Sequence, residues 1–126
     1  MNAFVTRVAI AGSLLALAAV SGIVVSRLGR PLSSAGLAVH KLVAAATVVM
    51  TVLVVIAIQK SSGIAGTALL MTVLAGVFLL SLFVTGALLS LDRTVSALLL
   101  AVHRAASVMA PASAAILFWI RLRGRV

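Results

Sequence analysis

The sequence contains no cysteine and no tyrosine, and it has only one acidic residue, Asp92, in 126 residues. The absence of cysteine excludes disulfides, thiolate catalysis, iron–sulfur clusters and cysteine-based zinc sites. A single carboxylate also excludes chemistry that needs a pair of acids. Charged residues make up 9% of the chain, whereas soluble domains carry about 25%. A water-facing globular surface cannot be built from so few charges.

Long hydrophobic runs are what the sequence has in their place, since 64% of its residues are hydrophobic. A transmembrane helix needs about 20 mostly apolar residues. Four windows without charged residues approach or exceed this length, at about 8–25, 37–58, 64–91 and 95–120. Because short connections make consecutive helices antiparallel neighbours, we predict an all-α, up-down-up-down bundle of four transmembrane helices. This bundle would form one integral membrane domain over residues 1–126.

Two halves of the chain resemble each other. Residues 11–26 and 75–90 share six identities at an offset of 64, and residues 37–41 match residues 100–104 at an offset of 63. The second match contains both histidines of the chain, each followed by a basic residue. We predict two duplicated helical hairpins, one over about 8–60 and the other over about 64–122.

The first window has some features of a signal peptide, because Arg7 precedes an apolar run that ends in the small residues 19–21. A cleaved leader would not be expected to recur as an internal membrane helix. The repeat therefore favours a permanent first span.

The two histidines are the main candidates for chemistry, because ionisable residues inside a membrane are costly and mark functional sites. His40 and His103 each lie about one turn inside the start of an even-numbered helix. In a square bundle these helices are diagonal, so the two imidazoles would face each other at one depth. The helix faces that continue from the histidines carry small residues, which are Ala44, Thr47 and Thr51 on one helix and Ser107, Ala110 and Ala114 on the other.

Glycines and basic residues complete this predicted site. Gly22 and Gly86 lie about one turn before the ends of the odd-numbered helices, at the depth of the histidines, and glycine lets a bulky ring approach the backbone closely. Haem iron takes two neutral imidazole nitrogens on opposite faces. We predict one haem b per chain, with metal ligation by His40 and His103. Its walls would be Gly22 and Gly86, and its propionate partners would be Lys41 and Arg104.

Other interpretations of the same residues stay open. Small residues on membrane helices are the usual packing surface, and a histidine near a helix start can simply form hydrogen bonds at the membrane interface. The chain would then be a cofactor-free accessory subunit of a larger membrane complex. A proton relay, another metal site or a small transporter is a further alternative, although the absence of an intramembrane carboxylate weakens the transporter.

The motifs Ala38-Val39-His40-Lys41-Leu42 and Ala101-Val102-His103-Arg104-Ala105 resemble four-helix membrane b-type cytochromes, in which histidines on the second and fourth helices hold haem. The chain looks most like one half of a haem A synthase, and it also resembles the bundles of cytochrome b and cytochrome b561. Two-haem bundles have a second histidine on each ligand helix, where this chain has Leu53-Val54 and Ile116-Leu117. Haem A synthases place a glutamate before a histidine, and this chain contains no glutamate.

The predicted role is electron transfer to or from a quinone, a soluble carrier or a membrane subunit, with a homodimer as one arrangement. Catalytic residues of its own are not expected. The net charge of +9 fits anionic lipid headgroups better than nucleic acid, because the cations flank the spans. If Lys41 and Arg104 serve propionates, the positive-inside rule places both termini in the cytoplasm, in a bacterial inner membrane.

Overall fold

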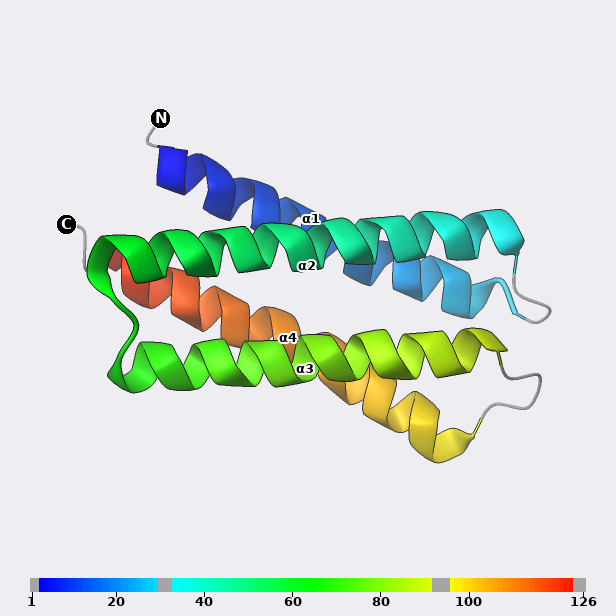
Figure 1. Cartoon of the computed structure of the whole chain (residues 1–126). Helices are drawn as coiled ribbons and strands as arrows, with labels where there is room; N and C mark the ends of the chain where they lie inside the picture. Colours follow the sequence, from blue (N-terminus) through cyan, green and yellow to red (C-terminus); the bar gives the residue numbers. More distant parts are fainter. Residues whose placement is uncertain (1–2, 30–32, 92–95, 124–126) are drawn as a thin grey trace. The chain divides into compact units, whose positions relative to one another are not determined.

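The computed structural model describes residues 3–29, 33–91 and 96–123. Within these ranges all regular secondary structure is α-helix. The helices, shown in Figure 1, are α1 (Ala3–Arg27), α2 (Ser34–Ser62), α3 (Gly66–Leu91) and α4 (Ala97–Arg123). The predicted all-α class with four long helices is therefore confirmed.

Each helix is long and apolar enough to cross a membrane. The shortest has 25 residues, which at about 1.5 Å per residue exceeds a hydrocarbon core of about 30 Å. Large hydrophobic side chains are exposed on all four helices, including Leu42 (71%), Leu80 (66%) and Leu98 (75%). Apolar exposure on this scale fits lipid as the surrounding solvent. The chain has the architecture of an integral membrane protein.

Helices α1 and α2 extend beyond their charge-free windows at both ends. Helix α1 begins five residues before Val8 and includes Arg7, and α2 continues past Ile58 through Lys60 to Ser62. Long basic side chains reach the headgroup region from a helical backbone. For these two helices the charge-free window underestimates the full helix length.

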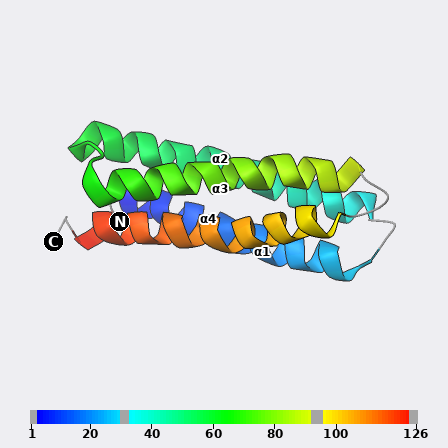
Figure 2. The same cartoon turned by 90° about the horizontal axis from the view of Figure 1, so that it is seen from below.

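The described helices form two compact units, with one boundary between Ser62 and Gly63. In the first unit α1 packs against α2, and in the second α3 packs against α4. Each unit is an antiparallel helical hairpin: in Figure 1 α1 passes behind α2 and α4 passes behind α3, and Figure 2 shows the same helices from below. The candidate residues are described below hairpin by hairpin.

Buried side chains follow one stripe on the second helix of each hairpin. On α2 this stripe contains Thr47, Thr51, Val54 and Ile58. At an offset of 63, α4 buries Ala110, Ala114 and Leu117. Ala11 on α1 and Ala75 on α3, which are buried at an offset of 64, are also small. Small residues let membrane helices approach closely, so these stripes have the composition of helix-packing surfaces.

Equivalent serines cap the second helix of each hairpin. The Ser33 hydroxyl accepts a hydrogen bond from the Gly36 amide at 3.3 Å, and the Ser96 hydroxyl accepts one from the Leu99 amide at 3.4 Å. Such caps satisfy backbone donors that have no partner inside the first turn. Both α2 and α4 therefore begin one residue after a capping serine, which fixes the histidines at the same helical position.

A basic side chain closes the far end of the second hairpin. Arg121 Nη2 donates a 2.5 Å hydrogen bond to the Gly63 carbonyl. Gly63 follows the end of α2 with a φ of 69°, a left-handed conformation that glycine adopts without steric cost. Near it in sequence, the Arg123 guanidinium stacks over the Trp119 ring at 4.4 Å from the centroid. Arg121 thus links the end of α4 to the turn before α3.

Candidate functional site

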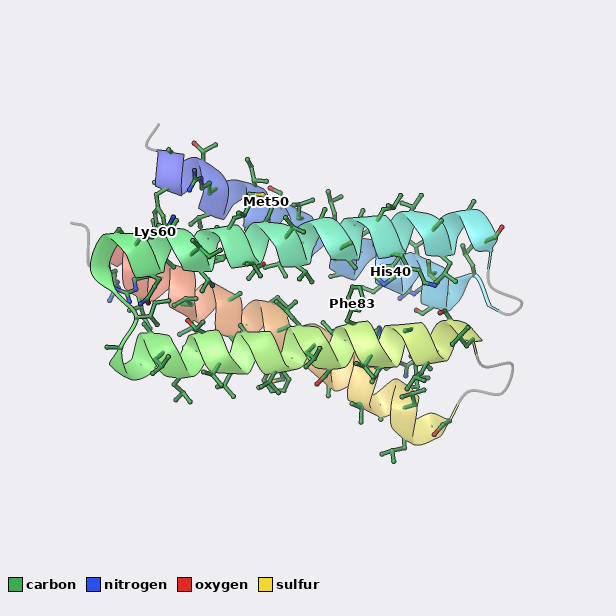
Figure 3. All side chains as sticks on the ribbon, in the orientation of Figure 1. His40, Met50, Lys60 and Phe83 are labelled. Carbon is green, nitrogen blue, oxygen red and sulfur yellow. The ribbon has the colours of Figure 1, made fainter. Side chains whose placement is uncertain are left out.

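His40 lies toward the end of α2 that is connected to α1, and Lys60 lies toward the opposite end (Figure 3). His40 is the seventh residue of α2, and His103 is the seventh residue of α4. Both histidines are therefore nearly two turns inside their helices, deeper than the one turn expected from the sequence. For His40 the difference arises because α2 starts at Ser34, three residues before the charge-free window.

In the first hairpin, His40 contacts a hydroxyl on α1. The distance from His40 Nδ1 to Ser21 Oγ is 2.9 Å. Ser21 Oγ also donates to the Ala18 carbonyl of its own helix at 3.1 Å. A serine hydroxyl has one proton and two lone pairs. A hydroxyl whose proton points to the Ala18 carbonyl offers only lone pairs to His40, so this geometry suits the Nδ1–H tautomer of His40.

The second hairpin repeats this arrangement with a threonine. The distance from His103 Nδ1 to Thr85 Oγ1 is 2.7 Å. Thr85 Oγ1 donates to the Ser81 carbonyl at 2.6 Å, so this geometry too suits a histidine with its proton on Nδ1. A neutral imidazole has one protonated nitrogen and one nitrogen with a lone pair. With the proton on Nδ1, Nε2 would carry the lone pair that binds a metal.

The predicted glycines lie directly against the histidine rings. A Cβ built on Gly22 would come within 3.1 Å of His40 Cε1, and one built on Gly86 would come within 3.3 Å of His103 Cε1. These distances are shorter than ordinary van der Waals contact. The bulky ring that approaches each glycine is thus the imidazole of the same hairpin. The predicted contact of Gly22 and Gly86 with a haem macrocycle remains a prediction.

The two basic residues of the predicted site, Lys41 and Arg104, each follow a histidine and are exposed. They are therefore accessible to an anionic group near the histidine. The faces of small residues are not exposed in this way, since Thr47, Thr51, Ala110 and Ala114 are buried. Burial of these side chains fits helix packing, which was the alternative interpretation of the small faces.

The structure describes each histidine with its own hydroxyl and glycine, and ligation of one iron by His40 and His103 together stays a prediction. Residues 3–29, 33–91 and 96–123 contain no cluster of three or more His, Cys, Asp or Glu side chains. A metal site within these ranges that used histidine would therefore use one or two imidazoles. Two imidazoles are enough for bis-histidine ligation of a haem.

Ser21 and Thr85 were not assigned to the site from the sequence. A usable signal was present, because each hydroxyl directly precedes a repeated glycine, in Ser21-Gly22 and Thr85-Gly86. The hydrogen bond from Arg121 to Gly63 had no signal of this kind. No known family, curated protein or solved structure matches the chain.

Proposed function

We propose that this protein is a membrane-embedded haem b protein with bis-histidine ligation that acts in electron transfer. One observation carries the proposal: each of the two histidines is held through Nδ1 by a hydroxyl, at 2.9 Å for His40 and 2.7 Å for His103. With Nδ1 as the donor of this hydrogen bond, Nε2 would carry the lone pair, and metal-binding histidines are usually oriented in this way.

The donor set fits the group. Bis-histidine ligation of haem needs two imidazoles, each with a lone pair on one ring nitrogen. The chain provides two histidines, and in each hairpin Nδ1 contacts a hydroxyl of the neighbouring helix. The exposed cations Lys41 and Arg104 would bind the two propionates. When bound, haem supplies a one-electron redox centre.

The chain's own residues would then bind and orient the haem. His40 and His103 would hold its iron, and a haem held by two protein ligands would supply one-electron transfer rather than chemistry on oxygen or a substrate. Electron transfer is favoured over an enzymatic reaction for this reason. The redox partner would be a quinone, a soluble carrier or a membrane subunit, and the chain would act within the lipid bilayer.

The finer localisation belongs to the same proposal: a bacterial inner membrane with both termini in the cytoplasm. Because the chain has no cysteine, single cysteines report topology without background. Ser61→Cys, near the end of α2, should be protected from an impermeant maleimide in intact cells, whereas Ser33→Cys, before α2, should be labelled. The reverse pattern would overturn this orientation.

The proposal is tested by the absorption spectrum of protein expressed with ample haem and purified in detergent. We expect a sharp α band and an intense Soret band on reduction, with one haem per chain. His40→Ala and His103→Ala should each abolish the six-coordinate spectrum. Val39→Ala and Val102→Ala are matched controls, since each alters the preceding exposed residue. Colourless wild-type protein, or His variants with the wild-type spectrum, would refute the proposal.

A further inference from the structure

The hydroxyls of Ser21 and Thr85 are arranged to accept a hydrogen bond from an imidazole rather than to donate one. Each directs its proton to a carbonyl within the preceding turn of its own helix, at 3.1 Å to Ala18 and 2.6 Å to Ser81. A hydroxyl fixed in this way has only lone pairs for the neighbouring helix. An imidazole that contacts such a hydroxyl through Nδ1 forms a hydrogen bond when its proton is on Nδ1.

Hydroxyls elsewhere on the same helices lack this second contact. Ser26 donates to the Ile23 carbonyl at 2.8 Å, and Thr72 donates to the Ala68 carbonyl at 2.8 Å. Both form the same local bond as Ser21 and Thr85 but lie away from the histidine rings. Hydrogen bonding to the helix backbone is therefore ordinary for these residues, and the contact with Nδ1 is what distinguishes Ser21 and Thr85.

We infer that Ser21 and Thr85 are positioning residues, which fix the Nδ1–H tautomer of His40 and His103 and aim Nε2 toward a metal. The part that concerns the iron rests on the proposed function. Partners of this kind orient the ligand ring and raise its basicity, and their loss typically lowers metal affinity by about 10- to 100-fold.

The two positioning residues are unequal. The distance from Thr85 Oγ1 to His103 Nδ1 is 2.7 Å, and the distance from Ser21 Oγ to His40 Nδ1 is 2.9 Å. Thr85 Oγ1 lies 2.6 Å from the Ser81 carbonyl, whereas Ser21 Oγ lies 3.1 Å from the Ala18 carbonyl. Thr85 is also buried, whereas Ser21 is half-buried, and a β-branched side chain is restricted in χ1. Thr85 therefore holds the more rigid acceptor, and its removal should have the larger effect.

The first measurement needs no haem. Protein labelled with ¹⁵N-histidine, purified without haem in micelles at a pH where the imidazoles are neutral, reports which ring nitrogen carries the proton. We expect Nδ1–H for both histidines in the wild type. Ser21→Ala should give mixed tautomers at His40 alone, and Thr85→Val should do so at His103 alone. Nε2–H as the main wild-type form would overturn the inference.

The second measurement uses haem-loaded protein. Thr85→Val should weaken haem binding by about 10- to 100-fold and Ser21→Ala by less. Both should raise the midpoint potential, because a less basic imidazole donates less charge to ferric iron. Ser26→Ala and Thr72→Val are the matched controls and should leave affinity and potential unchanged. Ser21→Thr and Thr85→Ser keep a hydroxyl, so both variants should retain the wild-type haem affinity and midpoint potential.

The two measurements separate this inference from the proposed function. If the protein binds no haem but shows the expected tautomers and their loss, the proposed function fails while the positioning of the imidazoles holds. If haem binds and Ser21→Ala and Thr85→Val change neither tautomer nor potential, the positioning role fails while the haem protein stands.

Discussion

The two hairpins hold their histidines alike but close their opposite ends differently. Near the histidines, both use a hydroxyl, a glycine and a capping serine at corresponding positions. At the far end, the first hairpin buries Phe4 on α1 and Ile58 on α2. At the corresponding offsets, the second hairpin has Ala68 on α3 and Arg121 on α4. The first end is closed by apolar bulk, and the second by a small residue and a hydrogen-bonded cation.

This difference indicates that helix packing at the far end can be achieved with different residues, whereas the residues around the histidines are alike in the two hairpins. Inside the membrane, packing and hydrogen bonding hold helices together, because lipid is as apolar as the side chains. A pair of bulky apolar residues and a guanidinium bound to a carbonyl can both perform this task. The histidine ends vary less between the hairpins, which is expected if they share one chemical purpose.

The largest predicted effect on stability lies at the end away from the histidines, where the two hairpins differ. Arg121→Met keeps most of the side-chain length but removes the hydrogen bond to the Gly63 carbonyl. Hydrogen bonds that involve a charged group contribute about 1.5–3 kcal/mol, so we expect the free energy of unfolding to fall by that amount. Denaturant unfolding in detergent, followed by circular dichroism, measures the change.

Arg123→Met is the control for this prediction. Arg123 lies two residues away, is exposed and stacks on Trp119. An exposed cation–π contact is worth about 0.5–1 kcal/mol. Equal losses in the two variants would show that the Gly63 carbonyl contact does not close the second hairpin.

The next largest effect on stability lies at the histidine ends, where the two hairpins are alike. Gly22→Ala places a methyl group 3.1 Å from His40 Cε1, and Gly86→Ala places one 3.3 Å from His103 Cε1. Overpacking of this kind costs about 1–3 kcal/mol, and we expect the larger loss in the first hairpin, where the contact is tighter. The midpoint of thermal unfolding and the ¹⁵N spectrum of the histidines report the displacement.

The controls for the glycine prediction come from the same repeat. Gly12 and Gly76 occupy corresponding positions, and a Cβ at either would meet no atom within 4 Å. Gly12→Ala and Gly76→Ala should stabilise by about 0.4–1 kcal/mol, because alanine restricts the unfolded chain. If Gly22→Ala and Gly86→Ala stabilise to the same extent, the imidazoles do not depend on the glycines.

The fold was largely predictable from sequence, because four apolar runs separated by charges specify four membrane helices. Helix ends were not, since Arg7 and Lys60 continue the helix although they interrupt the apolar run. The hydrogen bond from Arg121 to a carbonyl 58 residues away could not be predicted either. Its acceptor is a backbone atom, which leaves no mark in the side-chain pattern.

The sequence predicted those residues of the candidate site that are identical in the two halves of the chain. It did not predict the hydroxyl residues, which differ between the halves. His40 and His103, with Gly22 and Gly86, recur as identities, and the structure brings each histidine against its glycine. The hydroxyls recur as serine in one hairpin and threonine in the other, and such residues are common on packing faces of membrane helices. Only the contact with Nδ1 distinguishes Ser21 and Thr85 from those.

The smallest predicted effect concerns the buried stripes, where the first hairpin has Thr51 and the second has Ala114. Within the described residues, the Thr51 hydroxyl is buried without a hydrogen-bond partner, whereas Thr47 donates to the Val43 carbonyl at 2.8 Å. An unsatisfied buried hydroxyl costs about 1 kcal/mol or more. Thr51→Val, which keeps the shape and removes the hydroxyl, should therefore raise the free energy of unfolding by about 1 kcal/mol. Thr47→Val should not raise it, because that variant gives up a hydrogen bond. A loss of stability in Thr51→Val would mean that its hydroxyl has a partner in the membrane, and Thr51 would then differ in role from Ala114 at the corresponding position of α4.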